Sequence, residues 1–454
     1  MDFLKDFIVP PSANHVLLLK YILSIAMLLF LPYTSMLMGS SLISVYFNRR
    51  GYRENNKVYL RFAKDIIEKL TIGNNAHYAL GILPVISIIL AYTQLLYGTP
   101  TIAVPIMALS GLLFIIAFVF LYKFRNTYEI ESVISSLKDR ADAGAVKQSD
   151  SELEEINEYE ENILRSNSNS GWLGILFLYC AAYLFAGSTS LASDPDRWQN
   201  VVDILQIIFS WATIFNFLLL FIASGAVTGV AVLFYFFKWQ GGLPRMSSEY
   251  SSFARNFASN LALFSSISLP VLLFINILFL PKEALSQTFF LYHILVLIGV
   301  ILLCNILYHS IKNSDVRFTS AAFILVLLIF AFQIFQGNTA FGSAIGEQTL
   351  AANRKAEDIE KELIAKNTST TTVDAQQIYN TKCIACHRFD VKLVGPPYQQ
   401  TVPKYNGDVN KLADFIYNPV KKDPAFPPMP NQGLKKNEAL AMAKWLIEQV
   451  SGKK

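Results

Sequence analysis

The sequence predicts an all-α fold in two parts, an eight-helix transmembrane bundle followed by a small helical C-terminal domain. Two observations lead to this prediction: long apolar runs fill the first part of the chain, and a polar tail follows that contains the string Cys-Ile-Ala-Cys-His. Of the 454 residues, 53% are hydrophobic and only 16% are charged, whereas soluble globular proteins average about 25% charged residues. This composition indicates an integral membrane protein, and it excludes an ordinary soluble enzyme and a disordered protein.

The chain divides into three regions at changes in composition. Residues 1–342 form the membrane domain, residues 343–372 a charged and Thr-rich linker, and residues 373–454 the C-terminal domain. In the linker, residues 347–365 have the pattern of a charged amphipathic helix. The polar run 367–372 should end that helix, because it cannot bury enough apolar surface to order itself. We therefore expect a tether that keeps the tail near the membrane while allowing it to move.

A helix needs about 20 mostly apolar residues to cross the hydrocarbon core of a bilayer. Eight stretches meet this requirement: 16–47, 78–97, 101–122, 172–192, 202–239, 257–280, 288–309 and 318–335. The first and fifth are long, so each is either a tilted helix that continues beyond the bilayer or a pair of half-spans. The polar segment 125–169 should form a solvated helical hairpin or a flexible loop rather than a docking site for a partner.

The distribution of Lys and Arg predicts the orientation of the bundle. Cations cluster after the first span and recur in alternate short loops, whereas the other connections hold only Arg197 and Lys282. The first cluster consists of Arg49, Arg50, Arg53, Lys57, Arg61 and Lys64. Since cation-rich loops stay on the cytoplasmic side, the N-terminus and the C-terminal domain should both lie on the periplasmic side of a bacterial inner membrane. The net charge is only +4, so the lipid bilayer and not nucleic acid is the expected partner.

Cys383, Cys386 and His387 form the most informative motif in the sequence. Cys-x-x-Cys-His is the pattern of covalent haem attachment, in which both sulfurs form thioether bonds and the imidazole binds iron. Met429, which lies between prolines in Pro-Pro-Met-Pro, is the candidate for the second axial ligand, while Met442 should pack in the core of the closing helix. The alternative is a zinc or redox dithiol site, which would leave the methionine loop unexplained.

Further features of the tail surround this motif: Tyr379 precedes it by four residues, Gly-Pro-Pro follows at 395–397, and Trp445 lies in the last helical stretch. In this pattern residues 373–450 resemble the class I cytochromes c, although Ala375 replaces a glycine that is common in that family. The resemblance implies one covalent haem c, an electron-transfer role and haem attachment on the outer side of the membrane, which agrees with the predicted topology. The tail is rich in Lys, and this charge either steers an acidic redox partner or is simply solvated.

Two short runs stand out in the membrane domain, Phe-Leu-Pro-Tyr-Thr at 30–34 and Ser-Gly-Ala-Val-Thr-Gly at 224–229. They are similar to the first and fifth helices of subunit I of cytochrome bd-type oxidases, a superfamily in which some branches carry a fused cytochrome c. Where that family has haem-ligating histidines, this chain has Met27 and Leu220, and neither the acidic residues of the third helix nor the quinol-loop motif is present. The resemblance thus implies a relative of an oxidase subunit in which the oxygen-reducing haem and the quinol site are doubtful.

Four more histidines could hold b-type haem in the membrane domain. His15 and His293 should lie near the outer face, and His77 and His309 near the inner face, which would allow one bis-histidine site in each leaflet. The simpler interpretation is that those at the ends of spans are solvated interfacial residues. His293 is the best placed of the four, because ionisable residues within spans tend to be functional.

These observations favour an electron-transfer subunit of a respiratory complex related to cytochrome bd-type oxidases. Its expected partners are other membrane subunits and a cytochrome or other redox partner on the periplasmic side. Whether the chain is itself an enzyme stays open: in the alternative, its body binds b-type haems and the chain is a terminal oxidase or quinol-linked reductase subunit. A transporter or channel is least favoured, because the spans contain almost no charge to mark an ion path.

Overall fold

The computed structural model describes residues 10–71, 76–142, 150–244, 246–370 and 374–452. Within these ranges the chain is built from helices and loops without a β-strand. It separates into two compact units, Met1–Glu357 and Asp358–Lys454. The division falls inside helix α13 (Gly346–Thr370), within the residues that the sequence assigns to the linker. This organisation confirms the all-α prediction.

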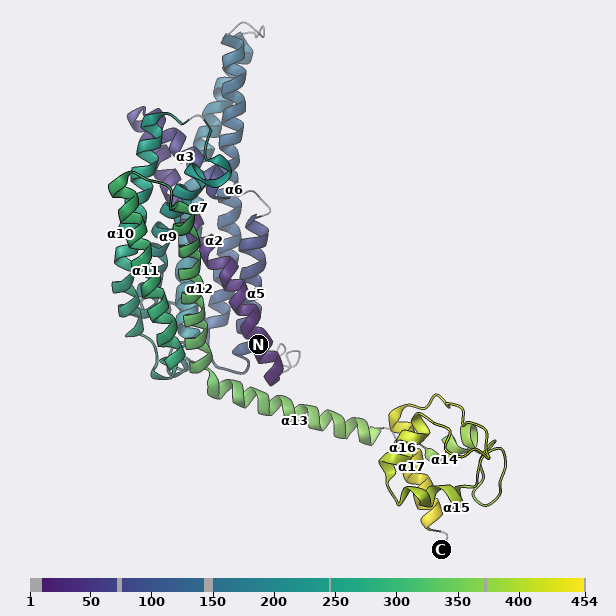
Figure 1. The fold of residues 1–454 in the computed structure, drawn as a ribbon. Coiled ribbons are helices and arrows are strands. Elements are labelled where there is room, and N and C mark those ends of the chain that lie inside the picture. The colour runs from purple at the N-terminus through teal and green to yellow at the C-terminus, as the bar shows by residue number, and fades with distance from the viewer. Residues whose placement is uncertain (1–9, 72–75, 143–149, 245, 371–373, 453–454) are drawn as a thin grey trace. The chain divides into compact units, whose positions relative to one another are not determined.

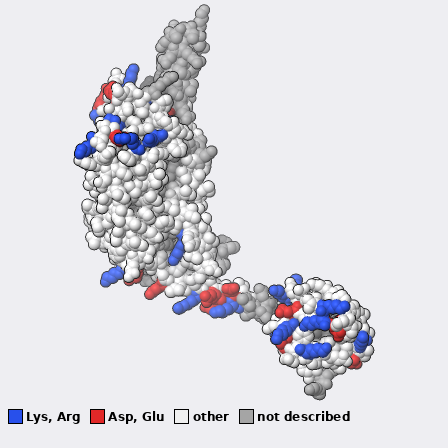
Figure 2. Space-filling model, viewed as in Figure 1, with Lys and Arg blue, Asp and Glu red and all other residues white. Residues whose placement is uncertain are grey.

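Eight helices in the first unit are long and apolar enough to cross a membrane, which confirms the predicted number of spans (Figure 1). The protein is therefore a multi-pass membrane protein. The helices are α2 (Ala13–Glu54), η1 with α5 (His77–Ile82 and Leu83–Leu95), α6 (Ala103–Asp142), α7 (Asp150–Ala192), α9 (Trp211–Phe237), α10 (Ser248–Ile277), α11 (Gln287–Asn313) and α12 (Thr319–Ala344). On the face shown in Figure 2, charged side chains gather at the two ends of the bundle and leave an uncharged band between them.

The two long apolar stretches turn out differently. The first is a single helix of 42 residues, α2, with Pro32 inside it. The fifth begins with a separate short helix, α8 (Ile204–Ile208), before α9 crosses as one helix of 27 residues. Neither stretch is a pair of half-spans.

The polar segment 125–169 is helical on both sides of residues 143–149. Helix α6 continues past its apolar part at Tyr128, and α7 begins well before its apolar part at Asn169. The two extensions run side by side beyond the other helices in Figure 1. Of the two predicted forms, the structure shows the helical hairpin, whose connecting residues 143–149 lie outside the described part.

The cation-rich segment after the first span is an amphipathic helix, α3 (Lys57–Leu70), that packs back along α2. The side chain of Asn56 caps it by accepting from the N–H groups of Val58 and Tyr59. Its apolar face, including Phe62 and Ile66, is fully buried. Because α3 folds back onto the bundle, the next span, which begins at His77, starts inside the bundle and not at its end.

Small residues let the central helices approach one another closely. A Cβ at Gly39 of α2 would lie 2.7 Å from the carbonyl oxygen of Ser224 on α9. A Cβ at Gly229 of α9 would lie 2.6 Å from the carbonyl oxygen of Ala258 on α10. The run 224–229 is thus a packing seam of the kind that drives helix association in membranes.

The second unit is a small helical domain. Its helices are α14 (Ala375–Ile378), η5 (Tyr379–Cys383), α15 (Tyr398–Thr401), η6 (Val402–Tyr405), α16 (Val409–Tyr417) and α17 (Lys436–Ser451). Ala375 is buried where α14 packs on α17, and the rings of Tyr379 and Trp445 meet at 5.3 Å. Met442 is fully buried, as predicted for the closing helix.

The linker helix is longer than the sequence predicts. Helix α13 continues through the polar run as far as Thr370, so the expected break at residue 367 is wrong. Residues 371–373, the end of the predicted tether, lie outside the described residues. A helical linker of this length acts as a semi-rigid spacer.

Candidate haem site

The cysteine motif lies at the turn that follows η5. The N–H groups of Cys386 and His387 both donate to the carbonyl oxygen of Cys383, at 3.1 and 2.9 Å. The N–H of Ile384 donates to Tyr379 at 2.9 Å, which ties the turn to the helix before it. This tight turn presents the two sulfurs and the imidazole to one side of the chain.

All four predicted site residues line one cavity of about 740 Å³. Cys383, Cys386 and His387 form one part of its wall, and Met429 forms another. Apolar side chains from α16 and α17, among them Leu412 and Leu446, complete it. The structure therefore brings together residues that lie far apart in the sequence.

The imidazole of His387 is held in a fixed orientation. Its Nδ1 lies 3.0 Å from the carbonyl oxygen of Pro396, to which it donates, so that Nε2 is the nitrogen left for a metal. The ring of Tyr398 stacks on it with centroids 5.0 Å apart and planes at 19°. Gly395 also packs against the imidazole of His387, so closely that a Cβ at position 395 would lie 2.2 Å from Cε1 of the ring.

Two side chains tie the methionine loop to the rest of the domain by donating to backbone carbonyl oxygens. Lys382 Nζ, next to the cysteine motif, donates to the carbonyl oxygen of Gln432 at 3.0 Å. Asn431 Nδ2 donates to the carbonyl oxygen of Tyr417 at 3.4 Å. The loop turns at Gly433, whose φ of 65° favours glycine. These contacts hold Met429 at the cavity wall, and the prolines beside it require no backbone donors.

The domain can be compared with known proteins. A family model described as Cytochrome c matches residues 372–449. Cytochrome c-551 of Pseudomonas aeruginosa is 34% identical over 80 residues, which are 17% of this chain and 77% of that protein. Cytochrome c-551 of Azotobacter vinelandii is 32% identical over 77 residues, 16% of this chain and 93% of that protein. The chain belongs to the cytochrome c family. No solved structure matches it.

The family model covers the cytochrome c domain alone. A further relative, cytochrome c-552 of Hydrogenobacter thermophilus, is 33% identical over 69 residues, 14% of this chain and 69% of that protein. The resemblance of the membrane body to subunit I of cytochrome bd-type oxidases stays a prediction. What the family membership establishes is an electron-transfer haem protein with a c-type domain.

The donor set of the cytochrome c domain fits a covalently bound haem. Both thiols are free, and His387 Nε2 and the Met429 thioether are available on the walls of one cavity. Burial raises the pKa of the Cys383 thiol above its ordinary value. Among the described residues no cluster of three His, Cys, Asp or Glu side chains could hold a metal ion, so the zinc alternative lacks support.

Charged side chains line part of the cavity. They are five lysines, Lys382, Lys404, Lys411, Lys421 and Lys422, and three aspartates, Asp408, Asp414 and Asp423; Lys side chains are prominent on the face of the domain shown in Figure 2. Lys422 Nζ lies 4.7 Å from the ring centroids of both Tyr405 and Phe415, and donates to the Tyr405 hydroxyl at 3.2 Å. The sequence showed the positive charge of the tail but not that five of its lysines line this cavity. Tyr398 was also missed, since an aromatic residue after Gly-Pro-Pro carries no signal of its own.

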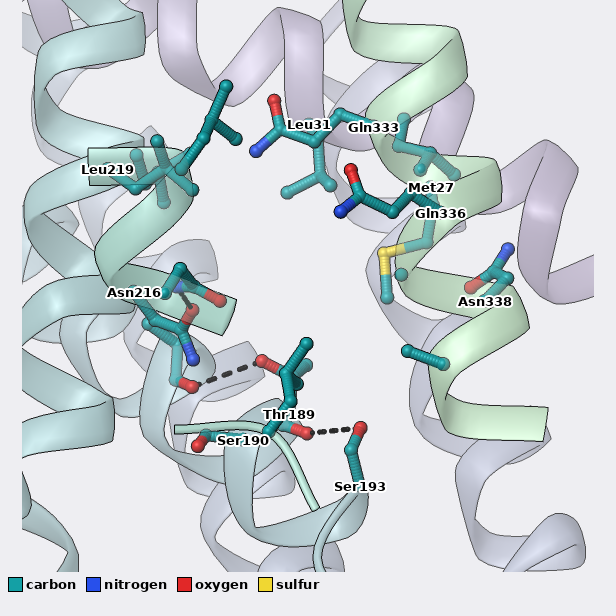
Figure 3. Close-up of a pocket in the computed structure, with 18 of the residues that line it drawn as sticks. Met27, Leu31, Thr189, Ser190, Ser193, Asn216, Leu219, Gln333, Gln336 and Asn338 are labelled. Carbon is teal, nitrogen blue, oxygen red and sulfur yellow. Dashed lines mark hydrogen bonds between the residues drawn. The ribbon is translucent and has the colours of Figure 1, made fainter. Parts of the chain in front are cut away.

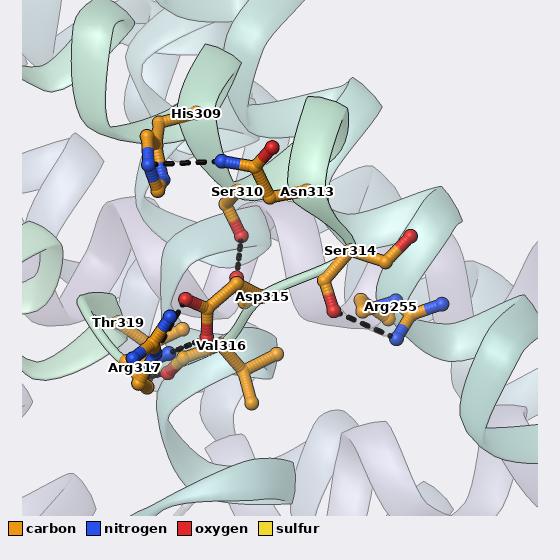
Figure 4. A network of polar contacts seen from close by, with 9 residues as sticks. All are labelled: Arg255, His309, Ser310, Asn313, Ser314, Asp315, Val316, Arg317 and Thr319. Atoms are coloured by element: carbon orange, nitrogen blue, oxygen red, sulfur yellow. Dashed lines mark hydrogen bonds and ion pairs between the residues drawn. The ribbon is translucent and has the colours of Figure 1, made fainter.

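The four histidines of the membrane body are not brought together. His15 and His309 are exposed, and His309 Nε2 lies 2.9 Å from Asn313 Nδ2 at the end of α11 (Figure 4). His77 and His293 are buried, on η1 and α11 respectively.

The position of His77 differs from the prediction. Its Nδ1 lies 2.5 Å from the hydroxyl of Tyr33, which is near the midpoint of α2. His77 is therefore deep in the bundle rather than near one face, because α3 folds back before the second span begins. Among the described residues, His77 does not face another histidine across a cavity.

Proposed function

We propose that this protein is a membrane-anchored monohaem c-type cytochrome that relays electrons in a respiratory complex of the bacterial inner membrane. The observation that carries the proposal is the single cavity lined by Cys383, Cys386, His387 and Met429, in a domain joined by α13 to an eight-helix body. The body would anchor the domain and dock with other membrane subunits, and its small-residue seam at 224–229 is consistent with descent from bd-type oxidase helices.

The residues that line the cavity would bind the haem or orient its ligand. Cys383 and Cys386 would hold the haem through thioether bonds, with His387 Nε2 and the Met429 thioether as axial ligands, and the haem would supply a reversible one-electron couple. Pro396 and Tyr398 keep the imidazole in one orientation through the 3.0 Å hydrogen bond and the ring stack. Two protein ligands leave iron without an open position for oxygen, which favours electron transfer over catalysis.

The proposed site of action is the periplasmic side. The cation-rich loops support this orientation through the positive-inside bias. A periplasmic or membrane-bound redox partner would then exchange electrons with the haem held in this cavity, where lysines outnumber aspartates. Acidic surfaces on such a partner would be attracted by Lys404 and Lys422, which raises the association rate at low ionic strength.

A pyridine haemochrome assay on the chain purified alone tests the proposal. We expect one c haem for each polypeptide and no b- or d-type signal in the reduced-minus-oxidised spectrum. A Cys383→Ser and Cys386→Ser double variant serves as the control and should lose the covalent haem. A c haem count of zero in the wild-type chain would refute the function.

A second candidate is that the body holds its own b-type haem and the chain is itself a terminal oxidase or quinol-linked reductase subunit. The observation in its favour is that the Nε2 atoms of His77 and His293 are buried without a hydrogen-bond partner. His293→Ala would remove a b-type signal under this alternative and would leave the spectrum unchanged under the first proposal.

A further inference from the structure

The haem cavity and a cavity inside the membrane unit differ in the charge of their walls. The membrane cavity, of about 230 Å³, has no charged side chain among the described residues that line it (Figure 3). Its polar lining includes hydroxyls on α7 and five carboxamides on α9, α10 and α12, which are Asn216, Asn276, Gln333, Gln336 and Asn338. The wall of the haem cavity, by contrast, includes lysines, and their contacts lead to the loop that carries Met429.

The methionine loop, residues 419–434, connects α16 to α17 and has few backbone donors. Five of its residues are proline, and proline has no N–H to donate. In the part of the domain that the structure describes, no backbone-to-backbone hydrogen bond joins this loop to other residues. Side chains must therefore hold the loop in place.

The first part of the loop is held by Lys422, which belongs to the loop itself. Its Nζ lies 4.7 Å from the ring centroids of both Tyr405 in η6 and Phe415 in α16. The same nitrogen donates to the Tyr405 hydroxyl at 3.2 Å. A cation within about 6 Å of the centroid of an aromatic ring is attracted by that ring. A single ammonium group thus attaches the start of the loop to two helices.

The middle and the end of the loop are held by lysines outside it. Lys392 Nζ lies 4.5 Å from the ring centroid of Phe426, in the middle of the loop. Lys382 Nζ donates to the carbonyl oxygen of Gln432, near the end of the loop, at 3.0 Å. Both lysines lie within residues 382–392, the segment that carries the cysteine motif. Two contacts therefore join this segment to the methionine loop.

Met429 lies between these two attachment points in the sequence, and His387 lies in the segment to which they lead. We propose that Lys382, Lys392 and Lys422 are positioning residues: they fix the methionine loop and so limit how readily another ligand displaces Met429. This inference rests on the proposed function, in which Met429 is an axial ligand. Attraction of an acidic partner depends on how many charges the domain carries, whereas positioning depends on which contacts it makes. The two roles can therefore be separated by experiment.

The test titrates free imidazole into the full haem-loaded, oxidised chain in detergent. Imidazole can bind the iron on this side only when the methionine gives way, so its dissociation constant measures how readily the loop opens. Loss of the sulfur-to-iron charge-transfer band follows the titration. We expect Lys382→Gln, Lys392→Gln and Lys422→Gln each to bind imidazole roughly two- to fivefold more tightly than the wild-type chain, which is the effect of losing one exposed cation–π contact or hydrogen bond.

Matched variants separate the contacts from the charge. Lys444→Gln removes one positive charge from the exposed surface of α17 without removing any of these contacts, so it should leave imidazole binding unchanged. Phe426→Leu should act like Lys392→Gln, and the double variant should have no larger effect than either single change, because both remove the same contact. Lys392→Arg should restore wild-type binding, since a guanidinium group also interacts with a ring. Haem content and melting temperature verify that each variant is loaded and folded.

Three results would overturn the positioning role and leave the axial assignment of Met429 standing. Unchanged imidazole binding in all three loaded lysine variants would mean that other contacts hold the loop. An equal effect of Lys444→Gln would mean that charge alone is responsible. Fully additive effects of Phe426→Leu and Lys392→Gln would mean that the two residues do not act through one contact. A wild-type oxidised chain without the sulfur-to-iron band would instead refute the axial assignment itself, and the positioning role with it.

Discussion

The close packing of Gly395 against His387 in the cytochrome c domain allows a specific prediction. A Cβ at Gly395 would lie 2.2 Å from Cε1, 2.6 Å from Nδ1 and 2.7 Å from Nε2 of the imidazole. The glycine cannot retreat, because its N–H donates to Cys386 at 2.8 Å. The ring cannot easily turn away either, since Pro396 and Tyr398 hold it. Gly395→Ala must therefore displace the proximal ligand.

The size of the displacement follows from these distances. Ordinary van der Waals contact begins at 3.4 Å, so the ring or the backbone must move by about 1.2 Å. In a close-packed site such an insertion costs about 1–3 kcal/mol. If the ring binds haem iron as proposed, the same movement would also disturb that ligation. We expect lower stability together with a changed haem spectrum and reduction potential.

The measurements are guanidinium unfolding, the low-spin absorption spectrum and a potentiometric titration of the haem-loaded chain. Gly346→Ala is the control, because a Cβ at Gly346 meets no atom within 4 Å. If Gly395→Ala has the stability, spectrum and potential of the wild-type protein, then His387 does not lie against Gly395 and the assigned site geometry is wrong.

Four further changes test other parts of the structure. Met429→Ala should abolish the sulfur-to-iron charge-transfer band and lower the reduction potential, since a thioether opposite imidazole raises that potential; redox titration measures both, and unchanged values would rule out Met429 as a ligand. Gly229→Leu should destabilise the bundle by about 1–3 kcal/mol, because its side chain would meet a backbone oxygen of α10; the melting temperature in detergent measures this. His77→Phe should cost about 1–3 kcal/mol by leaving the Tyr33 hydroxyl buried without its partner, and a double variant with Tyr33→Phe should recover part of that loss. In the haem-free chain, burial raises the pKa of Cys383, so alkylation of this thiol should need a higher pH than alkylation of an ordinary cysteine. Peptide mapping by mass spectrometry measures alkylation at this site alone.

The sequence predicts most of what depends on local pattern. The eight spans follow from apolar length, and the four residues proposed to hold haem, which the spacing around Cys383 and the proline loop around Met429 single out, line one cavity. Gly-Pro-Pro at 395–397 is part of the pattern that resembles the class I cytochromes c, and the Pro396 carbonyl oxygen lies 3.0 Å from His387 Nδ1. These features can be predicted from the sequence because each depends on a few neighbouring residues.

The features that the sequence did not predict depend on contacts between distant segments. Helix α3 looked like a cation-rich loop, because its apolar residues become meaningful only when they pack on α2. The linker helix extends to Thr370 although its polar residues were expected to end it. The carboxamides of the membrane cavity come from α9, α10 and α12, and no local motif marks residues that converge in this way.

The two buried histidines show why composition could not decide the haem content of the body. His77 is paired with Tyr33, 44 residues away, and His293 with Gln336, 43 residues away. In both pairs Nδ1 is engaged and only Nε2 remains. A bis-histidine haem needs two such nitrogens to face each other across a space large enough for a macrocycle. In the part of the chain that the structure describes, each of these two histidines has a partner side chain from a distant segment, and this arrangement could not be read from composition.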